Sequence, residues 1–290
     1  MRSISDSGIG SGKTCGAQTG GKKRDNGCGC QSLYVVGIGP GGPGYLSRRA
    51  SEVIREVEAV AGYSTYLDLI RPMIADKKII VSGMKKEVER VWEAIETALS
   101  GTSCALISSG DPGVYALAGL VFELCRENHI GLEGEHKEGR LCLHVEIIPG
   151  IPALCAGAAL LGAPLVHDFA AVSLSDLLTP WEVIEKRLMA AAEADFVIAL
   201  YNPRSKKRSW QLEAARKILL RFRKPETPVG IVTAAMRENQ RVWLTNLENI
   251  DVGMVDMQTT LFIGNSKTFV FEEKMVTPRG YGEKYDLKKT

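Results

Sequence analysis

Hydrophobic positions between residues 33 and 148 follow two alternating patterns. Short apolar runs that end in glycine or serine are typical of buried strands, and longer stretches with apolar residues three and four positions apart are typical of helices packed on one face. Strands are predicted at 33–38, 59–61, 78–81, 104–108 and 143–148, and helices at 47–57, 85–99 and 113–127. This alternation favours a mainly parallel sheet covered by helices.

A second set of elements follows Pro149-Gly-Ile-Pro152, which interrupts the pattern. Small apolar residues over 153–161 predict a closely packed helix. The stretch Thr179-Pro-Trp-Glu182 predicts a helix start, with Thr179 as the N-cap, proline at the first helical position and glutamate at the third. Strands are predicted at 196–200, 229–232, 241–245 and 260–264, with a helix at 210–222.

The chain has 290 residues, which is enough for two domains of ordinary size. The break at Pro149-Gly-Ile-Pro152 is the expected boundary between them. We expect a disordered Gly- and Cys-rich tail at 1–31, an N-terminal α/β domain at 32–149, a C-terminal α/β domain at 150–276 and a polar tail at 277–290.

The composition indicates which broad class of protein the chain belongs to. Hydrophobic residues make up 45% and charged residues 24% of the chain, as in folded globular proteins, and a net charge of +2 gives no sign of nucleic-acid binding. No apolar run approaches the roughly 20 residues needed to cross a bilayer. The N-terminus lacks the apolar core of a secretory signal, so a cytoplasmic location is expected.

The seven cysteines fit a reducing compartment. Cys15, Cys28 and Cys30 lie in the N-terminal tail, too few and at the wrong spacing for a zinc site, and an iron–sulfur cluster would lack a fourth ligand. We therefore predict no metal site. The others are expected to pack as small core residues: Cys104, Cys125, Cys142 and Cys155.

The glycines of 37–42 match the G-x-G-x-x-G spacing of dinucleotide-binding loops. A dinucleotide fold starts its helix at the third glycine, whereas here the helix is expected only near Ser47. Pro40 has no N–H to offer a phosphate, and the second strand runs into Gly62-Tyr63 where an acidic partner for ribose would stand. The loop is better suited to a bulky, uncharged ligand that approaches the backbone closely.

Three stretches give the chain a family resemblance. Gly37-Ile-Gly-Pro-Gly41, Ser109-Gly-Asp-Pro-Gly-Val-Tyr115 and Pro149-Gly-Ile-Pro-Ala153 occur in the order found in the tetrapyrrole methylases. The resemblance implies a two-domain class III methyltransferase fold, with a mainly parallel N-terminal sheet and a mixed C-terminal sheet. It also implies that S-adenosylmethionine binds in the cleft between the domains.

Later stretches are similar to the C17-methyltransferases within that family. They are Pro164-Leu-Val-His-Asp-Phe169, Ser173-Leu-Ser-Asp-Leu-Leu-Thr-Pro-Trp181 and Leu200-Tyr-Asn-Pro-Arg-Ser-Lys-Lys-Arg208. The resemblance, which covers about 33–275, implies methylation of precorrin-3B or cobalt-precorrin-3 at C17, with ring contraction, in the synthesis of the corrin ring of cobalamin. It also implies a homodimer. Whether the substrate carries cobalt stays open.

The resemblance also indicates which residues line the donor pocket. They are Pro40, Ser109, Gly110, Asp111, Val114, Pro152, Ala153, Asn202, Ala235 and Thr260. Methyl transfer mainly requires donor and acceptor carbons to be held ~3–3.5 Å apart, so loops of small residues suit it. Asp111 is expected to give polar recognition, or to be the N-cap of the helix at 113–127, or both. Asn202 departs from the family, in which this position is often apolar.

The acceptor would carry acetate and propionate carboxylates, which arginine forks match in geometry. The main candidates for binding them are Arg204, Lys206, Lys207 and Arg208. A solvated helix start is the alternative role for this stretch. Arg237 and Arg241 are weaker candidates of the same kind.

Ring contraction would benefit from a positioned acid or base. His167 and Asp168 are the candidates, against the alternative that His167 is structural. Tyr115 and Tyr201 are expected to be packing residues whose hydroxyls are hydrogen-bonded.

Two other functions stay open at this point. A nicotinamide oxidoreductase would use the glycine loop and respond to NAD(P), but not to S-adenosylhomocysteine. A non-catalytic tetrapyrrole carrier would bind the pigment but no methyl donor.

Overall fold

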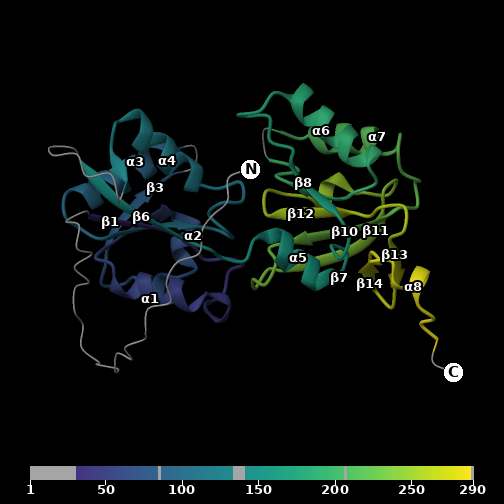
Figure 1. The fold of residues 1–290 in the computed structure, drawn as a ribbon, viewed down its shortest axis with the longest axis horizontal. Coiled ribbons are helices and arrows are strands. Elements are labelled where there is room, and N and C mark those ends of the chain that lie inside the picture. The colour runs from purple at the N-terminus through teal and green to yellow at the C-terminus, as the bar shows by residue number, and fades with distance from the viewer. Residues whose placement is uncertain (1–30, 84–85, 133–140, 206–207, 289–290) are drawn as a thin grey trace, which may run out of the picture.

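The computed structural model describes residues 31–83, 86–132, 141–205 and 208–288, which form two lobes that lie side by side (Figure 1). In the first lobe the strands follow the order β3-β2-β4-β1-β6-β5, and the pairs are parallel, as predicted. Their bounds are β1 (Gln31–Gly37), β2 (Ala59–Tyr63), β3 (Lys78–Ser82), β4 (Cys104–Ser108), β5 (Gly131–Leu132) and β6 (Cys142–Ile148).

Helices cover both faces of this sheet (Figure 1). One face packs against α1 (Arg48–Glu56) and α2 (Ser64–Asp68), and the other against α3 (Glu87–Leu99) and α4 (Ala118–Glu127). Successive strand residues point to opposite faces, so Val36 joins the α1 cluster whereas Val35 joins the α3 cluster. Burial on both faces explains why the central strands β2 and β4 appear as continuous apolar runs.

The second lobe contains a mixed sheet, as predicted, and its strands follow the order β11-β10-β12-β9-β8. The strands β8 and β9 are parallel, and the other pairs are antiparallel. The bounds are β8 (Phe169–Ser173), β9 (Val197–Tyr201), β10 (Pro228–Thr233), β11 (Arg241–Asn246) and β12 (Thr259–Ile263).

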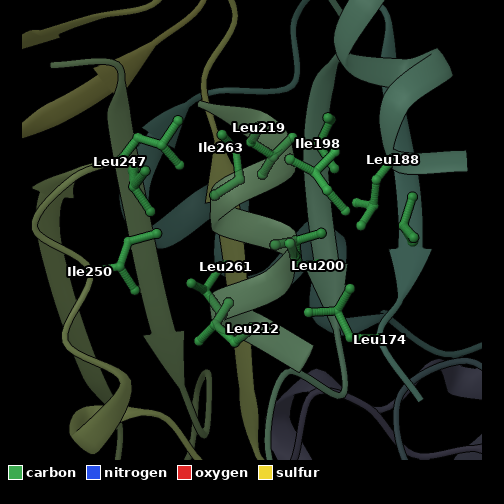
Figure 2. Packing of buried hydrophobic residues seen from close by; sticks show 14 of the residues in the cluster. Leu174, Leu188, Ile198, Leu200, Leu212, Leu219, Leu247, Ile250, Leu261 and Ile263 are labelled. Atoms are coloured by element: carbon green, nitrogen blue, oxygen red, sulfur yellow. The ribbon is translucent and has the colours of Figure 1, made fainter. Parts of the chain in front are cut away.

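Two helices, α6 (Trp181–Glu193) and α7 (Gln211–Leu219), cover one face of the mixed sheet. Figure 2 shows the leucine and isoleucine side chains that fill this interface. The other face packs against α5 (Ala153–Leu161), whose bounds match the prediction. A Cβ on Gly157 would lie 2.7 Å from the Phe262 ring, so a small residue is required where this helix meets β12.

Shorter elements complete the second lobe. The strands β7 (Gly162–Ala163), β13 (Phe269–Phe271) and β14 (Lys274–Val276) form a small sheet in the order β13-β14-β7. The segment expected to be a polar tail contains a short helix, α8 (Tyr281–Lys284). The 3₁₀ turns are η1 (Pro43–Tyr45), η2 (Arg71–Met73) and η3 (Val252–Met254).

Several local predictions were wrong. The helix α6 starts at Trp181, and its N-cap is Pro180, whose carbonyl accepts from the Val183 N–H, so Thr179 is not the cap. Cys155 is exposed and not in the core, because α5 buries other positions, Leu154, Ala156, Gly157 and Leu161. Cys104 and Cys125 are buried as predicted.

The predictions on the tail cysteines, on metal sites and on membrane spans can be compared only with the residues that the structure describes. The three tail cysteines, Cys15, Cys28 and Cys30, lie outside it. Within it, no group of His, Cys, Asp or Glu is arranged to hold a metal ion. None of the described helices has the length and apolar character required to span a bilayer.

Candidate active site

A cavity of about 290 Å³ lies between the two lobes. Its first-lobe wall comes from the loops at the carboxyl ends of β1, β2 and β4, and its second-lobe wall from the ends of β9 and β10 and the start of β12. Seven of the residues predicted for the donor pocket line it: Pro40, Ser109, Gly110, Ala153, Asn202, Ala235 and Thr260. Carboxyl ends of parallel strands are where open α/β sheets bind ligands.

The glycine loop after β1 packs against two other loops and does not form a phosphate cradle. A Cβ on Gly39 would lie 2.3 Å from the Gly110 Cα and 2.3 Å from the Ile151 carbonyl oxygen. The Gly39 N–H donates to the Gly110 carbonyl at 3.0 Å, and the Gly39 carbonyl accepts from the Ile151 N–H at 3.4 Å. Because these backbone groups are already paired, the glycine spacing reflects close packing of backbone on backbone.

Asp111 joins two loops of this wall. Its Oδ1 accepts from the Gly113 N–H at 2.8 Å, and its Oδ2 accepts from the Gly150 N–H at 3.2 Å. The expectation that Asp111 caps the helix at 113–127 was wrong, because α4 starts at Ala118. Asp111, Val114 and Pro152 are not among the residues that line the cavity; Pro152 is the N-cap of α5.

The second-lobe wall contains strained backbone. Asn202 and Ala234 have φ values of 51° and 49°, in the left-handed region that residues other than glycine seldom adopt. The Asn202 side-chain amide donates to the Ser173 Oγ at 3.0 Å. Such strain persists only where neighbouring contacts hold it, and it tends to occur at functional sites.

The two described arginines of the basic stretch after β9 are hydrogen-bonded to backbone carbonyls of the protein. Arg204 donates from Nη1 to the Val252 carbonyl at 2.6 Å, and Arg208 donates from Nη2 to the Asn202 carbonyl at 2.9 Å. Arg208 is only 7% exposed, and burial lowers its pKa. Neither arginine lines the cavity, and Lys206 and Lys207 lie outside the described residues.

His167 and Asp168 lie in the loop between β7 and β8, away from the residues that line the cavity. The His167 Nδ1 accepts from the Asp168 N–H at 2.8 Å. The Asp168 side chain is largely exposed. The structure therefore does not bring this pair to the cavity.

Both tyrosines expected to be packing residues have a hydrogen-bonded hydroxyl. The Tyr115 hydroxyl donates to the Ala171 carbonyl at 2.8 Å, and the Tyr201 hydroxyl accepts from the Leu154 N–H at 2.8 Å. Their ring centroids are 5.0 Å apart. Burial raises the pKa of Tyr201 to about 12, so its phenol stays neutral at physiological pH. Tyr201 also lines the cavity.

Other wall residues were not predicted for the donor pocket. Tyr63 is the last residue of β2 and Tyr66 lies on α2, and their rings meet edge to face with centroids 5.3 Å apart. Arg237, from the loop after β10, also lies in the wall. Their position at or shortly after the carboxyl end of a strand could have identified the two tyrosines, because several predicted residues, such as Ser109 and Asn202, lie just after a strand. The remaining wall residues are Thr65, Ile151, Ala234, Met257, Gln258 and Thr259.

Comparison with known proteins gives consistent matches. The family model for tetrapyrrole (corrin/porphyrin) methylases matches residues 32–251. A cobalt-factor III methyltransferase from Priestia megaterium is 47% identical over 258 residues, which cover 89% of this chain and 46% of that protein. A probable cobalt-factor III C(17)-methyltransferase from Salmonella typhimurium is 47% identical over 249 residues, 86% of this chain and 99% of the relative.

The chain thus spans about half the length of the Priestia relative and nearly all of the Salmonella one. Among solved structures, the methyltransferase CobJ superposes with a TM-score of 0.77 at 34% identity, over 86% of this chain and 100% of that structure.

Proposed function

The chain belongs to the tetrapyrrole methylases, and from this premise we propose that it is an S-adenosylmethionine-dependent C-methyltransferase of corrin-ring synthesis. It methylates C17 of precorrin-3B or cobalt-precorrin-3, with contraction of the ring. Relatives with 47% identity are named for action on cobalt-factor III, which supports a cobalt-containing substrate. The observation that carries the proposal is the cavity itself, because seven residues predicted from family motifs meet there from both lobes.

The wall of the cavity suits the methyl donor. S-adenosylmethionine, when bound, supplies an electrophilic methyl group on a positively charged sulfur. The Tyr63, Tyr66 and Tyr201 rings are in the wall, and aromatic faces attract such cations. Small residues such as Gly110 and Ala153 allow the ligand to approach the backbone closely. We therefore assign the donor to this cavity.

The size of the cavity indicates that donor and acceptor bind at different places. Its volume of about 290 Å³ is just below the roughly 300–1,000 Å³ typical of small-molecule sites. A cavity of this size could not hold a tetrapyrrole beside the donor. We infer that the macrocycle lies at the mouth of the cavity, with C17 facing the methyl group. The lobes then exclude water and fix the alignment of the two reacting carbons, which is the main requirement of this transfer.

The methylation step needs little acid–base help from the wall. None of the described lining residues carries a carboxylate or an imidazole. The nucleophile is an electron-rich ring carbon, so positioning accounts for the step. His167 and Asp168 stay predictions for ring contraction, and they require the macrocycle to extend to their loop. In His167→Ala and Asp168→Asn variants, we expect a methylated product that is not contracted.

The proposal includes a homodimer and a cytoplasmic location. The edge strand β13 supports the dimer, because Phe269, Val270 and Phe271 are all exposed on it. An apolar edge strand with unpaired backbone groups favours pairing with another chain. Light scattering tests this: Phe271→Ser should shift a dimer towards monomer. Cell fractionation tests the location.

Product analysis tests the activity. The purified chain is incubated with S-adenosylmethionine carrying a deuterated methyl group and with the trimethylated precursor, either metal-free or loaded with cobalt. We expect the product mass to rise by one labelled methyl group, with faster turnover of the cobalt form. No label in either product would contradict the proposed function.

A further inference from the structure

Arg237 bridges the two lobes across the cavity. It lies in the second-lobe loop between β10 and β11, and its Nε donates to the Pro40 carbonyl of the first lobe at 3.0 Å. Its Nη2 donates to the Ser109 Oγ at 2.9 Å. A Cβ on Gly41 would lie 2.6 Å from the Arg237 Cγ, so the arginine stem packs directly on the glycine loop. The guanidinium is thus fixed in the wall of the cavity.

The charge of Arg237 has no acidic partner in the part of the chain that the structure describes. Its described hydrogen-bond acceptors, the Pro40 carbonyl and the Ser109 hydroxyl, are neutral. The side chain is partly buried, and this burial lowers its pKa. Among the described wall residues, Arg237 alone carries a charge. A partly desolvated cation is destabilising unless it is paired, so the cavity favours an anionic ligand group at this point.

We propose that Arg237 binds a carboxylate of the molecule that occupies the cavity. A guanidinium has five N–H donors, and two of them serve Pro40 and Ser109, so three stay free for a ligand. The arginine fork pairs with a carboxylate through two parallel hydrogen bonds. This inference rests on the proposed function, in which both substrates carry the required group: the donor has one carboxylate on its methionine part, and the tetrapyrrole has several.

The described part of the basic stretch after β9 does not compete for this role. Arg204 and Arg208 donate to backbone carbonyls and do not line the cavity. Arg237, a weaker candidate in the sequence, is therefore better placed than Arg204 and Arg208 to bind a carboxylate in the cavity. Because Arg237 also joins the two lobes, a carboxylate bound to it would contact the same side chain that holds the lobes together.

Calorimetry with two donor analogues tests the proposal and identifies the source of the carboxylate. S-adenosylhomocysteine carries the carboxylate, whereas 5′-methylthioadenosine keeps the adenosine and sulfur but lacks the amino-acid part. If the donor is the source, Arg237→Gln should weaken S-adenosylhomocysteine about tenfold or more, the loss expected for a hydrogen bond to a charged group, and leave methylthioadenosine within about twofold.

If the tetrapyrrole is the source, both analogues should bind Arg237→Gln as they bind the unchanged protein. The KM for the tetrapyrrole should then rise about tenfold, with a smaller change in kcat. Arg237→Lys keeps the charge but loses the fork, so it should recover only part of the affinity. Arg126→Gln, on the exposed side of α4, is the control for loss of one positive charge.

Two outcomes would overturn the proposal. One is that neither analogue affinity nor the tetrapyrrole KM changes in Arg237→Gln. The other is that both analogues weaken equally, because Arg237 would then maintain the shape of the pocket and not bind a carboxylate. Thermal melting of each variant shows that it is folded. Failure of the unchanged protein to bind S-adenosylhomocysteine would instead count against the proposed function.

Discussion

Arg208 donates from Nη2 to the carbonyl oxygen of Asn202 at 2.9 Å, at the point where Asn202 adopts a φ of 51°. A buried cation therefore holds a strained residue in the cavity wall. The side chain expected to contact the substrate acts instead from behind the wall. This relationship predicts that Arg208 affects both stability and ligand affinity without touching the ligand.

Replacing Arg208 with methionine should destabilise the fold by about 1.5–3 kcal/mol, the range for hydrogen bonds made by charged groups. It should also weaken S-adenosylhomocysteine, because Asn202 is no longer held in place. Urea unfolding and calorimetry measure the two effects. Normal affinity in the folded variant would show that Asn202 keeps its conformation unaided.

The close packing of the glycine loop predicts a sharp difference between two glycines. Gly39→Ala places a Cβ 2.3 Å from backbone atoms of two other loops, so it should destabilise the protein by about 1–3 kcal/mol and abolish donor binding. Gly44→Ala, in the same loop region, has no atom within 4 Å of its Cβ and should stay within about 0.5 kcal/mol. Denaturant midpoints compare the two. Similar losses would contradict the packing account.

The raised pKa of Tyr201 predicts a dependence of stability on alkaline pH. The unfolded phenol loses its proton near pH 10, whereas burial keeps it on the folded protein up to about pH 12. The folded state therefore binds more protons between these values, and its stability falls as pH rises through this window. Tyr201→Phe should have a shallower decline over the same range. Identical slopes in urea titrations would argue against burial as the cause.

Cysteine reactivity should follow exposure. Burial raises the pKa of the Cys104 thiol to about 12 and also raises that of Cys125, so both stay protonated and shielded near neutral pH. Cys155 is exposed. Iodoacetamide should label Cys155 in the folded protein and leave Cys104 and Cys125 unlabelled until denaturant is added. Peptide mass mapping checks this, and early labelling of Cys104 would contradict its burial.

Much of the fold could be predicted from the sequence where one physical signal dominated. The strand Cys104–Ser108 is apolar because both of its faces are covered, and α5 is rich in small residues because it lies close to β12. The strand β8 was missed, because Phe169–Ser173 is partly exposed and contains two alanines. The start of α4 was placed too early, since a turn held by Asp111 precedes it.

The cavity could be predicted only in part. Its motif loops stand out in the sequence because their glycines and prolines are unusual. The contribution of Arg237 depends on how the second lobe sits on Pro40 and Ser109, which lie 197 and 128 residues earlier in the chain. Likewise, the inward direction of Arg204 and Arg208 depends on carbonyl groups that only the folded chain brings near them. The sequence shows which residues are positively charged, but not the direction in which their side chains point in the folded protein.

The most direct test is a crystal structure of the chain with S-adenosylhomocysteine. We expect the ligand between the lobes, in contact with Pro40, Gly110 and Thr260, and with its sulfur directed towards the mouth of the cavity. Density for the ligand at another surface, with this cavity unchanged and empty, would contradict the assignment of the donor site and the mechanism that depends on it.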